Sequence, residues 1–432
     1  MKKFILVFFF TFLISSVSAN ESFLFYLKSA YDKNPKLNAE RKNLEATKQD
    51  INISKSEFLP SISVTGSLED NQSKNRTNQS GTSLSDTNRE TQTKSLSIDQ
   101  KLFQGFEGYN SLLKSKLELE QANLKLVQME QSVLLEAASI YFDMILKTKN
   151  KQFNLSNIDL FERQVETDSV RLQKGEITLT DLAQSESSLA GAKAKLITAE
   201  TELNNVEANF ERITSSNAPK EVESFLNLNI NLPSTLDEAL ELSKKNNPKL
   251  LIAQLDVKIS EKNLNIEKAQ IAPSASLNYS RSESDDFNSS VDKTDQETVK
   301  ATITWPLVKG GKNYSSIKKS KFKKAQSELM FQDVINEVKS ETTNSWSVYQ
   351  SSQSVLNATL SQLNAAEIAN EGITLEYDSG NTRTTLEVIQ SRSLLLEARI
   401  ANSKAERDFI VSKFKLLKST GGLSFEFLKN SI

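Results

Sequence analysis

The chain has 432 residues, and its 53 lysines and arginines nearly balance its 55 aspartates and glutamates, for a formal net charge of −2. This balance argues against a nucleic-acid-binding surface, which needs an excess of basic residues. The sequence contains no histidine and no cysteine, which removes the commonest general base, the commonest metal ligand and thiolate metal sites. These facts weigh against an enzyme, and we expect no catalytic, cofactor-binding or metal-binding residues.

The first residues predict a secretory signal peptide over 1–19. Lys2 and Lys3 form its basic start, an apolar run covers 4–14, and small residues follow at Val17-Ser18-Ala19. A membrane-anchoring helix is the alternative, but the apolar run is short for one. Later in the sequence no run approaches the ~18 consecutive apolar residues that a spanning helix needs. If the exported chain crosses a membrane again, we expect β-strands to do so.

The rest of the sequence contains one pattern twice. The first copy runs from Asn34-Pro35 to Pro60-Ser61, and the second from Asn247-Pro248 to Pro273-Ser274. Both prolines are offset by 213 (248−35 and 273−60), so the copies align without a gap. Because internal repeats determine an architecture, we divide the chain into repeats and the segments around them. These are a first structural repeat over 20–213, a connector over 214–236, a second repeat over 237–422 and a C-terminal tail over 423–432.

Each repeat predicts a helix, a strand, a loop, a strand, a long helix, a turn and a second helix. In the first repeat, a lead-in helix over 22–33 and a helix over 37–58 precede two alternating segments. A polar stretch over 69–94 separates these segments and is predicted to be a loop, as is the stretch over 280–296 in the second repeat. We expect strands of about 9–11 residues, the length of a tilted membrane β-strand. The connector is expected to be irregular, with room for a small strand over 225–232.

The longest predicted elements are helices. No glycine or proline occurs between Gly108 and Gly175, or between Gly311 and Gly372. A helix of about 65 residues is about 100 Å long. Apolar residues spaced by sevens predict helix-on-helix packing. In the first long helix they occupy two heptad positions, Leu113, Val127, Leu134 and Tyr141 on one and Leu117, Leu124, Ala138 and Ile145 on the other.

Second helices over 180–213 and 386–420 follow the turns at Gly175 and Gly380. Tyr141 and Trp346 occupy matching places in the two long helices, and we predict that both are packing residues. Trp305 and Tyr279 fit either an aromatic girdle at a membrane interface or simple strand packing.

The strand count constrains the assembly. Four strands cannot close a barrel, since the smallest spanning barrels have about eight, and an open edge in lipid leaves costly unsatisfied backbone groups. Three chains would share a twelve-stranded barrel, and the long helices would project into the periplasm. The predicted fold class is therefore mostly α with membrane β, in which long antiparallel coiled-coil helices accompany four strands per chain of a shared trimeric β-barrel. Such an assembly is a conduit.

Over residues 22–422 the sequence resembles the TolC-type outer-membrane channels of efflux and type I secretion. The resemblance implies a homotrimer in the outer-membrane lipid with a periplasmic helical tunnel. It also implies two protein partners, a periplasmic adaptor (membrane fusion) protein and an inner-membrane ABC or proton-driven transporter. The resemblance is carried by the doubled Asn-Pro units, by the motifs Leu102-Phe103-Gln104-Gly105 and Trp305-Pro306-Leu307-Val308-Lys309-Gly310-Gly311, and by the turns Arg171-Leu172-Gln173-Lys174-Gly175 and Tyr377-Asp378-Ser379-Gly380.

The resemblance also implies functional residues near the turns. The hairpin tips at Arg171, Gly175 and Gly380 would receive the adaptor, although the glycines are also expected simply as turn residues. A latch that holds the coiled coils closed would consist of Thr180 and Asp181 in the first repeat and of Tyr377 and Arg383 in the second. In this latch Asp181 would pair with Tyr377 and Arg383.

The resemblance also implies an acidic ring at the aperture, near the start of the predicted helix over 386–420. Glu387 occupies its first position, and Gln390 stands where the family pattern has a second acid, which should weaken cation selectivity. The sequence has one extra residue after Gly380, so the register is uncertain by one position. The alternative for Glu387 is a solvated helix face.

The leading hypothesis is a passive trimeric duct without catalytic activity, for small-molecule efflux or for type I protein secretion, which the sequence does not separate. The alternative is a periplasmic coiled-coil adaptor or scaffold without a pore, which would not need a repeated pair of alternating strands. A secreted hydrolase is a third possibility, but no acid–base or nucleophile constellation is present in the sequence.

Overall fold

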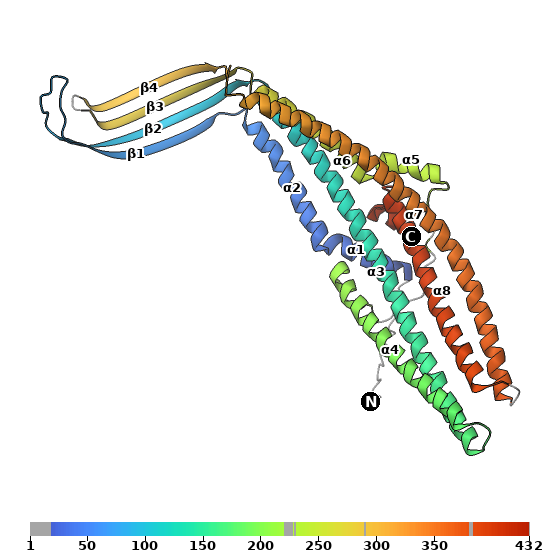
Figure 1. Cartoon of the computed structure of the whole chain (residues 1–432). Helices are drawn as coiled ribbons and strands as arrows, with labels where there is room; N and C mark the ends of the chain where they lie inside the picture. The colour runs from blue at the N-terminus through green and yellow to red at the C-terminus, as the bar shows by residue number, and fades with distance from the viewer. Residues whose placement is uncertain (1–18, 220–227, 229, 289–290, 380–382, 432) are drawn as a thin grey trace, which may run out of the picture. The chain divides into compact units, whose positions relative to one another are not determined.

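The computed structural model describes residues 19–219, 228, 230–288, 291–379 and 383–431, so the predicted signal peptide lies outside them except for Ala19. The order of elements follows the predicted repeat twice (Figure 1). The helices are α1 (Ala19–Lys33), α2 (Pro35–Ser56), α3 (Glu107–Gln173), α4 (Leu179–Thr214), α5 (Leu236–Asn246), α6 (Pro248–Ala269), α7 (Lys312–Asp378), α8 (Thr385–Ser419) and α9 (Phe425–Ser431). The strands are β1 (Ser61–Ser73), β2 (Thr87–Gln104), β3 (Ser274–Asn288) and β4 (Val291–Thr304).

The chain forms two compact units, and each combines segments of both sequence repeats. The helical unit comprises Met1–Glu40, Leu126–Pro248 and Ile335–Ile432, and the sheet unit comprises Arg41–Lys125 and Lys249–Val334. The described residues of the connector over 214–236 therefore belong to one unit, the helical unit.

The paired helices of the two repeats match in length. Helices α2 and α6 each have 22 residues, and α3 and α7 each have 67. Pro35 and Pro248 are the first residues of α2 and α6, a position where proline is favoured because its missing N–H would have no partner in the helix. The absence of glycine and proline over most of α3 and α7 lets each continue as one helix, as predicted.

The asparagine before each proline makes the same long-range contact in both repeats. Asn34 donates its Nδ2 to the carbonyl of Ile213 at 2.9 Å, and Asn247 donates its Nδ2 to the carbonyl of Ser419 at 2.9 Å. Both asparagines are buried, at 4% and 5% exposure. The last carbonyls of a helix have no partner within it, so each asparagine satisfies the end of the second hairpin helix, α4 or α8. We call these two contacts the asparagine clamps.

The core of the helical unit lies around Phe23 of α1. Its ring contacts those of Tyr141 and Phe142 of α3 at centroid distances of 4.9 and 5.2 Å, and that of Phe414 of α8 at 6.0 Å. The heptad positions of α3 that fall in this unit are buried as predicted, with the exception of Val127, which is 40% exposed. The buried ones are Leu134, Ala138, Tyr141 and Ile145. Trp346 is also buried, beside Ala239 and Leu416, so Tyr141 and Trp346 are packing residues.

The predicted C-terminal tail is in fact part of this core. It contains α9, whose Leu428 is fully buried, and the ring of Phe425 stacks on that of Tyr31 at 5.1 Å. The backbone N–H of Phe425 donates to Glu130 Oε1 at 3.0 Å. In the connector, Leu228 and Ile230 are buried without forming a strand, and half of the predicted small strand (225–227 and 229) lies outside the described residues.

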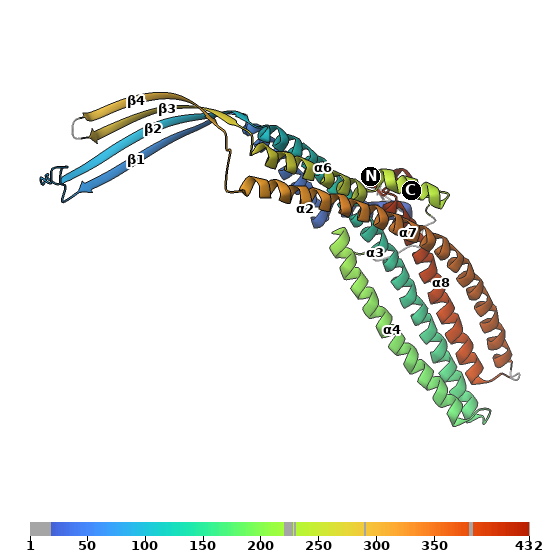
Figure 2. The same ribbon diagram turned by 45° about the horizontal axis from the view of Figure 1, so that its top comes forward.

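The sheet is antiparallel throughout, with the strands in chain order β1-β2-β3-β4 (Figure 2). Its central pairing, β2 with β3, joins the first repeat to the second. In the paired registers, Val64 faces Leu96, Ile98 faces Tyr279, and Tyr279 faces Val299. Because side chains alternate between the two faces, one face is largely apolar and the other is lined mainly by serine and threonine.

The strands are longer than the sequence predicted, with 13, 18, 15 and 14 residues. Their extra length comes from the polar stretches that were predicted to be loops. Backbone pairing continues through them because it needs no apolar side chain, and opposite charges across strands support it. Arg281 contacts Asp295 at 2.8 Å, for example, and Lys293 contacts Asp285 at 3.3 Å. The loop between β1 and β2 is thereby reduced to 74–86.

Among the described helices, none combines the length and apolar character needed to cross a membrane.

We predict that Asn34→Ala and Asn247→Ala both lower the free energy of unfolding. Each leaves a buried carbonyl without its amide donor, which costs about 1–3 kcal/mol. The loss should be larger for Asn34→Ala, because the carbonyl of Ser419 keeps a second donor, Thr342 Oγ1 at 3.4 Å. Denaturant unfolding of the detergent-solubilised protein, followed by circular dichroism, measures both. The control is Asn52→Ala, an exposed residue bonded only to Gln49, and equal losses in all three variants would contradict the clamps.

Gly421, which follows α8, gives a second stability prediction. Gly421 and Gly175 both have positive φ, +78° and +74°, but a Cβ at 421 would overlap the backbone of Asn246, whereas a Cβ at 175 has nothing within 4 Å. Both alanine variants carry the strain of a left-handed backbone. We expect Gly421→Ala to cost about 1–3 kcal/mol more than Gly175→Ala because of the overlap. Equal thermal unfolding curves for the two variants would disprove this reason.

Candidate functional site at the hairpin ends

The first hairpin reverses at Gly175, between α3 and α4. The N–H of Gly175 donates to the carbonyl of Leu172 and that of Glu176 to the carbonyl of Arg171, both at 2.9 Å. This pair of bonds is the Schellman ending of a helix, which requires the positive φ that glycine adopts without strain. Arg171 Nε also contacts Glu176 Oε2 at 3.2 Å, which holds the two sides of the turn together.

The acidic residues that were predicted for the latch and the ring both cap helices. Asp181 accepts from the backbone N–H of Thr178 at 2.9 Å, and Glu387 accepts from that of Thr384 at 2.8 Å. Each threonine hydroxyl accepts a bond from the N–H of its acid in return, which completes a capping box. The bonds from the backbone N–H groups of Thr178 and Thr384 are the main reason that the pKa values of Asp181 and Glu387 are lowered.

Arg383 ties the second hairpin together across its turn. Its Nε lies 2.6 Å from Glu376 Oε2 of α7, and its Nη1 lies 2.9 Å from Glu387 Oε1 of α8. The Arg383 side chain is 39% exposed, so these ion pairs are screened by solvent and contribute little to stability. Gly380, which was predicted as an adaptor-docking residue, lies outside the described residues.

A buried carboxylate joins the two hairpins. Asp168 of α3 is fully buried. Its Oδ1 accepts from the hydroxyl of Tyr377 of α7 at 2.6 Å and from Gln164 Nε2 at 2.9 Å, and its Oδ2 accepts from Ser185 Oγ of α4 at 2.5 Å. The Tyr377 hydroxyl also lies 3.1 Å from Thr385 Oγ1 of α8. Helices α3, α4 and α7 therefore meet at one carboxylate, and α8 joins them through Tyr377. We call these five residues the Asp168 network.

Two arginines surround this network. The guanidinium of Arg171 lies over the ring of Tyr377 at 4.5 Å, a cation–π contact. Arg392 of α8 is buried, and its Nη1 donates to the carbonyl of Leu160 of α3 at 2.9 Å. Burial lowers the pKa of Arg392, and the negative charge of Asp168 is among the groups that oppose this shift. The arginines thus supply positive charge near a carboxylate that has no contact with solvent.

Burial, followed by the bond to Asp168, raises the pKa of Tyr377. The neutral hydroxyl is therefore favoured in the folded protein. The stability that this neutral hydroxyl contributes is fully present below the ordinary tyrosine pKa. It is lost as the pH rises through the raised pKa of Tyr377 in the folded protein. At neutral pH the tyrosine is a hydrogen-bond donor to Asp168.

The predicted pairing of Asp181 with Tyr377 and Arg383 is not the one that a single chain makes. Asp181 bonds to Thr178, Tyr377 bonds to Asp168 and Thr385, and Arg383 bonds to Glu376 and Glu387. Within one chain Asp181 is already held by the helix N-terminus that it caps, so the predicted latch pairing stays a prediction. Thr180 and Gln390 are exposed, and Glu387 is partly exposed on α8 one turn before Gln390.

Sequence reasoning missed Asp168, Ser185 and Thr385. A signal was present, since Asp168 continues a stripe of buried residues on α3 that includes Ile158 and Phe161. A carboxylate at a buried position must be hydrogen-bonded or paired, so this break in the stripe pointed to a polar contact between helices.

The repeat, the four-stranded sheet with one apolar face and the two long helical hairpins define the fold of an outer-membrane channel subunit. Residues 26–215 and 239–422 of this chain match a protein family that is described as "Outer membrane efflux protein". The chain therefore belongs to the outer membrane efflux protein family, which confirms the resemblance seen in the sequence.

Relatives and solved structures extend this result. The chain is 26% identical to the outer membrane efflux protein BepC of Brucella suis, over 97% of this chain and 89% of BepC. It is 23% identical to the outer membrane protein TolC of Vibrio cholerae, over 95% and 93% of the two chains. The fold matches the CmeC outer membrane channel of Campylobacter jejuni with a TM-score of 0.81 at 15% identity, over 96% of this chain and 91% of CmeC.

Family membership places this protein in the outer membrane, as predicted, and makes it an efflux channel component. The proteins that it resembles are channels.

We predict that Tyr377→Phe loosens the contact between the two hairpins. The variant keeps the ring under Arg171 but removes the donor to a buried carboxylate, a bond worth about 1.5–3 kcal/mol. Amide hydrogen exchange over 365–379 should therefore accelerate roughly ten- to hundredfold where local opening limits it. The control is Tyr314→Phe at a residue that is 72% exposed. Unchanged exchange in Tyr377→Phe would show that the Asp168 network does not hold the hairpins together.

Proposed function

We propose that this chain is one subunit of a passive, trimeric export duct. The main supporting observation is the sheet, whose outer strands β1 and β4 each have a single neighbour in the described part of the chain. In lipid such edges leave backbone groups unsatisfied, at several kcal/mol for each group. Edge-to-edge pairing of three copies would satisfy them in a twelve-stranded barrel, while two copies would close a barrel too narrow for sizeable cargo.

In this proposal the long helices extend the barrel as a periplasmic tunnel. A periplasmic adaptor would dock at the hairpin tips, near Arg171, Gly175 and Gly380, and would connect the duct to an inner-membrane transporter. The transporter, of the ABC or proton-driven type, would supply the energy. The cargo is either a small molecule or a protein exported by type I secretion. Membership in the outer membrane efflux protein family supports the duct over the alternative of a periplasmic adaptor without a pore.

The gate of the duct would lie at the hairpin ends. The Asp168 network holds the α7–α8 hairpin to the α3–α4 hairpin within one subunit, so movement of one hairpin must break the Tyr377–Asp168 bond. Thr180 and Arg383 are exposed and, with Asp181, would contribute contacts between neighbouring subunits. Exposed charged contacts of this kind are worth about 0–1 kcal/mol each, so adaptor contacts can replace them at little cost.

The aperture ring would depend on Glu387 alone, because Gln390 is neutral. Glu387 is also bonded to Arg383 and to Thr384, which offsets part of its charge. We therefore expect weak cation selectivity.

We predict that the double variant Tyr377→Phe, Arg383→Ala raises single-channel conductance in planar bilayers roughly severalfold, because it removes contacts inside a hairpin and between hairpins that oppose opening. The control is Tyr314→Phe, Arg399→Ala. Arg399 pairs with Glu367 at 3.2 Å, so the control loses one hydroxyl and one ion pair, while the tested variant loses one hydroxyl and the two ion pairs of Arg383. Equal conductance of the two variants would disprove the gate but not the duct.

The duct itself is tested by mild crosslinking in intact cells, followed by purification from the outer membrane. A trimer recovered with an adaptor and an ABC exporter would assign protein secretion, and a trimer recovered with a proton-driven pump would assign efflux. Recovery of a single chain from the soluble fraction would overturn the proposal.

A further inference from the structure

A strongly basic segment follows the last strand. Between Glu297 and Glu328 the sequence has no acidic residue. The same interval contains the lysines Lys300, Lys309, Lys312, Lys318, Lys319, Lys321, Lys323 and Lys324. In a chain whose charges nearly cancel, this concentration in one stretch of the sheet unit is exceptional.

The segment begins where the sheet ends. The residues of β4 on the apolar face are Val299, Ala301 and Ile303, and Trp305 continues the same alternation. The indole of Trp305 is 64% exposed, and its Nε1 donates to the carbonyl of Ile271 at 3.2 Å, which fixes the ring at the end of the sheet. Exposed tryptophans at the ends of membrane strands occupy the headgroup level. The lysines that follow in the chain therefore begin at the periplasmic border of the membrane.

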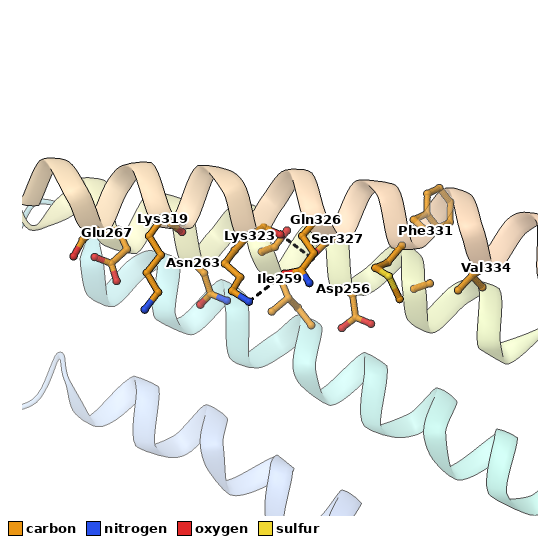
Figure 3. Close-up of a pocket in the computed structure, with 15 residues that line it drawn as sticks. Asp256, Ile259, Asn263, Glu267, Lys319, Lys323, Gln326, Ser327, Phe331 and Val334 are labelled. Atoms are coloured by element: carbon orange, nitrogen blue, oxygen red, sulfur yellow. Dashed lines mark hydrogen bonds between the residues drawn. The ribbon is translucent and has the colours of Figure 1, made fainter.

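Some of these lysines already face acidic residues. Lys319 and Lys323 line a cavity of about 580 Å³ between α6 and α7, together with Asp256 and Glu267 (Figure 3). Lys324 lies 3.9 Å from Glu261 and 3.7 Å from Glu328. Lys324 is therefore near two acids, while Lys319 and Lys323 share a cavity with two acids, and Lys323 Nζ donates to Gln326 Oε1 at 3.1 Å.

The other lysines of the helix have no such partner. Within the described part of the chain, Lys312, Lys318 and Lys321 form no ion pair, and all three are exposed. Lys318 and Lys321 lie on the same face of α7, three residues apart. Tyr314 and Phe322 flank them on this face and are 72% and 66% exposed. Exposed aromatic rings among unpaired lysines are typical of a surface that meets lipid headgroups.

The corresponding part of the first repeat lacks this character. Helix α3 starts after β2 as α7 starts after β4, but its first two turns and those that follow carry acids among the lysines. Lys114, for example, lies 3.5 Å from Glu118. The basic surface is therefore a property of the second repeat alone and is not needed for the strand-to-helix junction itself.

We propose that Lys312, Lys318 and Lys321 bind the anionic phospholipid headgroups of the periplasmic leaflet of the outer membrane. The inference rests on the proposed function only in that the sheet spans this membrane. The headgroup phosphate supplies the negative charge that the three lysines lack within the chain. Clusters of lysines beside a membrane-spanning element attract anionic lipid, and the attraction falls off within one screening length of the surface. The surface thus sets the depth of the duct and enriches anionic lipid around it.

Trp305 serves as a built-in probe for this surface. The protein has two tryptophans, and Trp346 is 8% exposed within a packed cluster, so it adds a constant background. The purified trimer is reconstituted in vesicles that contain phosphatidylcholine and either brominated phosphatidylglycerol or brominated phosphatidylcholine. Quenching of Trp305 by each lipid then gives their relative affinity at the protein surface.

We expect a preference for phosphatidylglycerol of roughly fivefold or more, about the effect of one lysine at an anionic surface. The preference should disappear at about 1 M salt, where the screening length is about 3 Å. The preference should also disappear in the triple variant Lys312→Gln, Lys318→Gln, Lys321→Gln. The matched control replaces the same three lysines with arginine, which preserves the charge and should preserve the preference.

Three results would overturn the inference. These are equal quenching by the two lipids in the original protein, an unchanged preference in the glutamine variant, and loss of the trimer in the glutamine variant alone, which would place the lysines between subunits. Channel conductance is measured on the same samples. A conducting trimer without lipid preference would reject the lipid surface and leave the duct in place, whereas a protein that neither assembles nor conducts would reject the duct.

Discussion

The two asparagine clamps are the interaction on which the rest of the helical unit depends. Each hairpin is a very long pair of helices, and the carbonyls at the far end of its second helix have no partner within that helix. Asn34 and Asn247 each supply a hydrogen-bond donor to one of these carbonyls, although they lie well over a hundred positions away in the sequence. The proline after each asparagine starts the next helix, so one dipeptide both ends a hairpin and directs the chain toward the sheet. A duplicated sequence thereby produces two hairpins that are anchored in the same way.

The Asp168 network is the counterpart of the clamps at the other end of the hairpins. A buried carboxylate is costly unless it is fully hydrogen-bonded, and here its partners come from the same helix, from α4 and from α7. Such a network is stable only while the hairpins are together, so separation exposes the carboxylate and loses several bonds at once. In the proposed gate, the hairpins would open at the Asp168 network while the asparagine clamps hold the other end.

The sheet shows a different kind of dependence. In the described part of the sheet unit, β1 and β4 each pair with one strand, and the apolar face is largely exposed. Lipid can cover the apolar face, and only another strand can satisfy the edges. The basic surface on α7 follows the same logic, because lysines without acidic partners in the chain suit an anionic surface outside it. In the proposed duct, assembly and membrane insertion would complete a structure that the single chain leaves open.

By itself, the sequence determined the repeat, the order of the elements, the long helices, the alternating strands and the family, because periodicity, glycine and proline act locally and twice. It also placed the important turns at Gly175 and near Tyr377. Only the tertiary structure decided which residues meet there. Asp181 and Glu387 are capping residues, and Asp168 is the carboxylate that reaches Tyr377. It also decided that the strands extend through polar stretches and that the tail forms α9, which packs on the core. These features depend on backbone pairing and on contacts between distant segments, which a local pattern of residues does not encode.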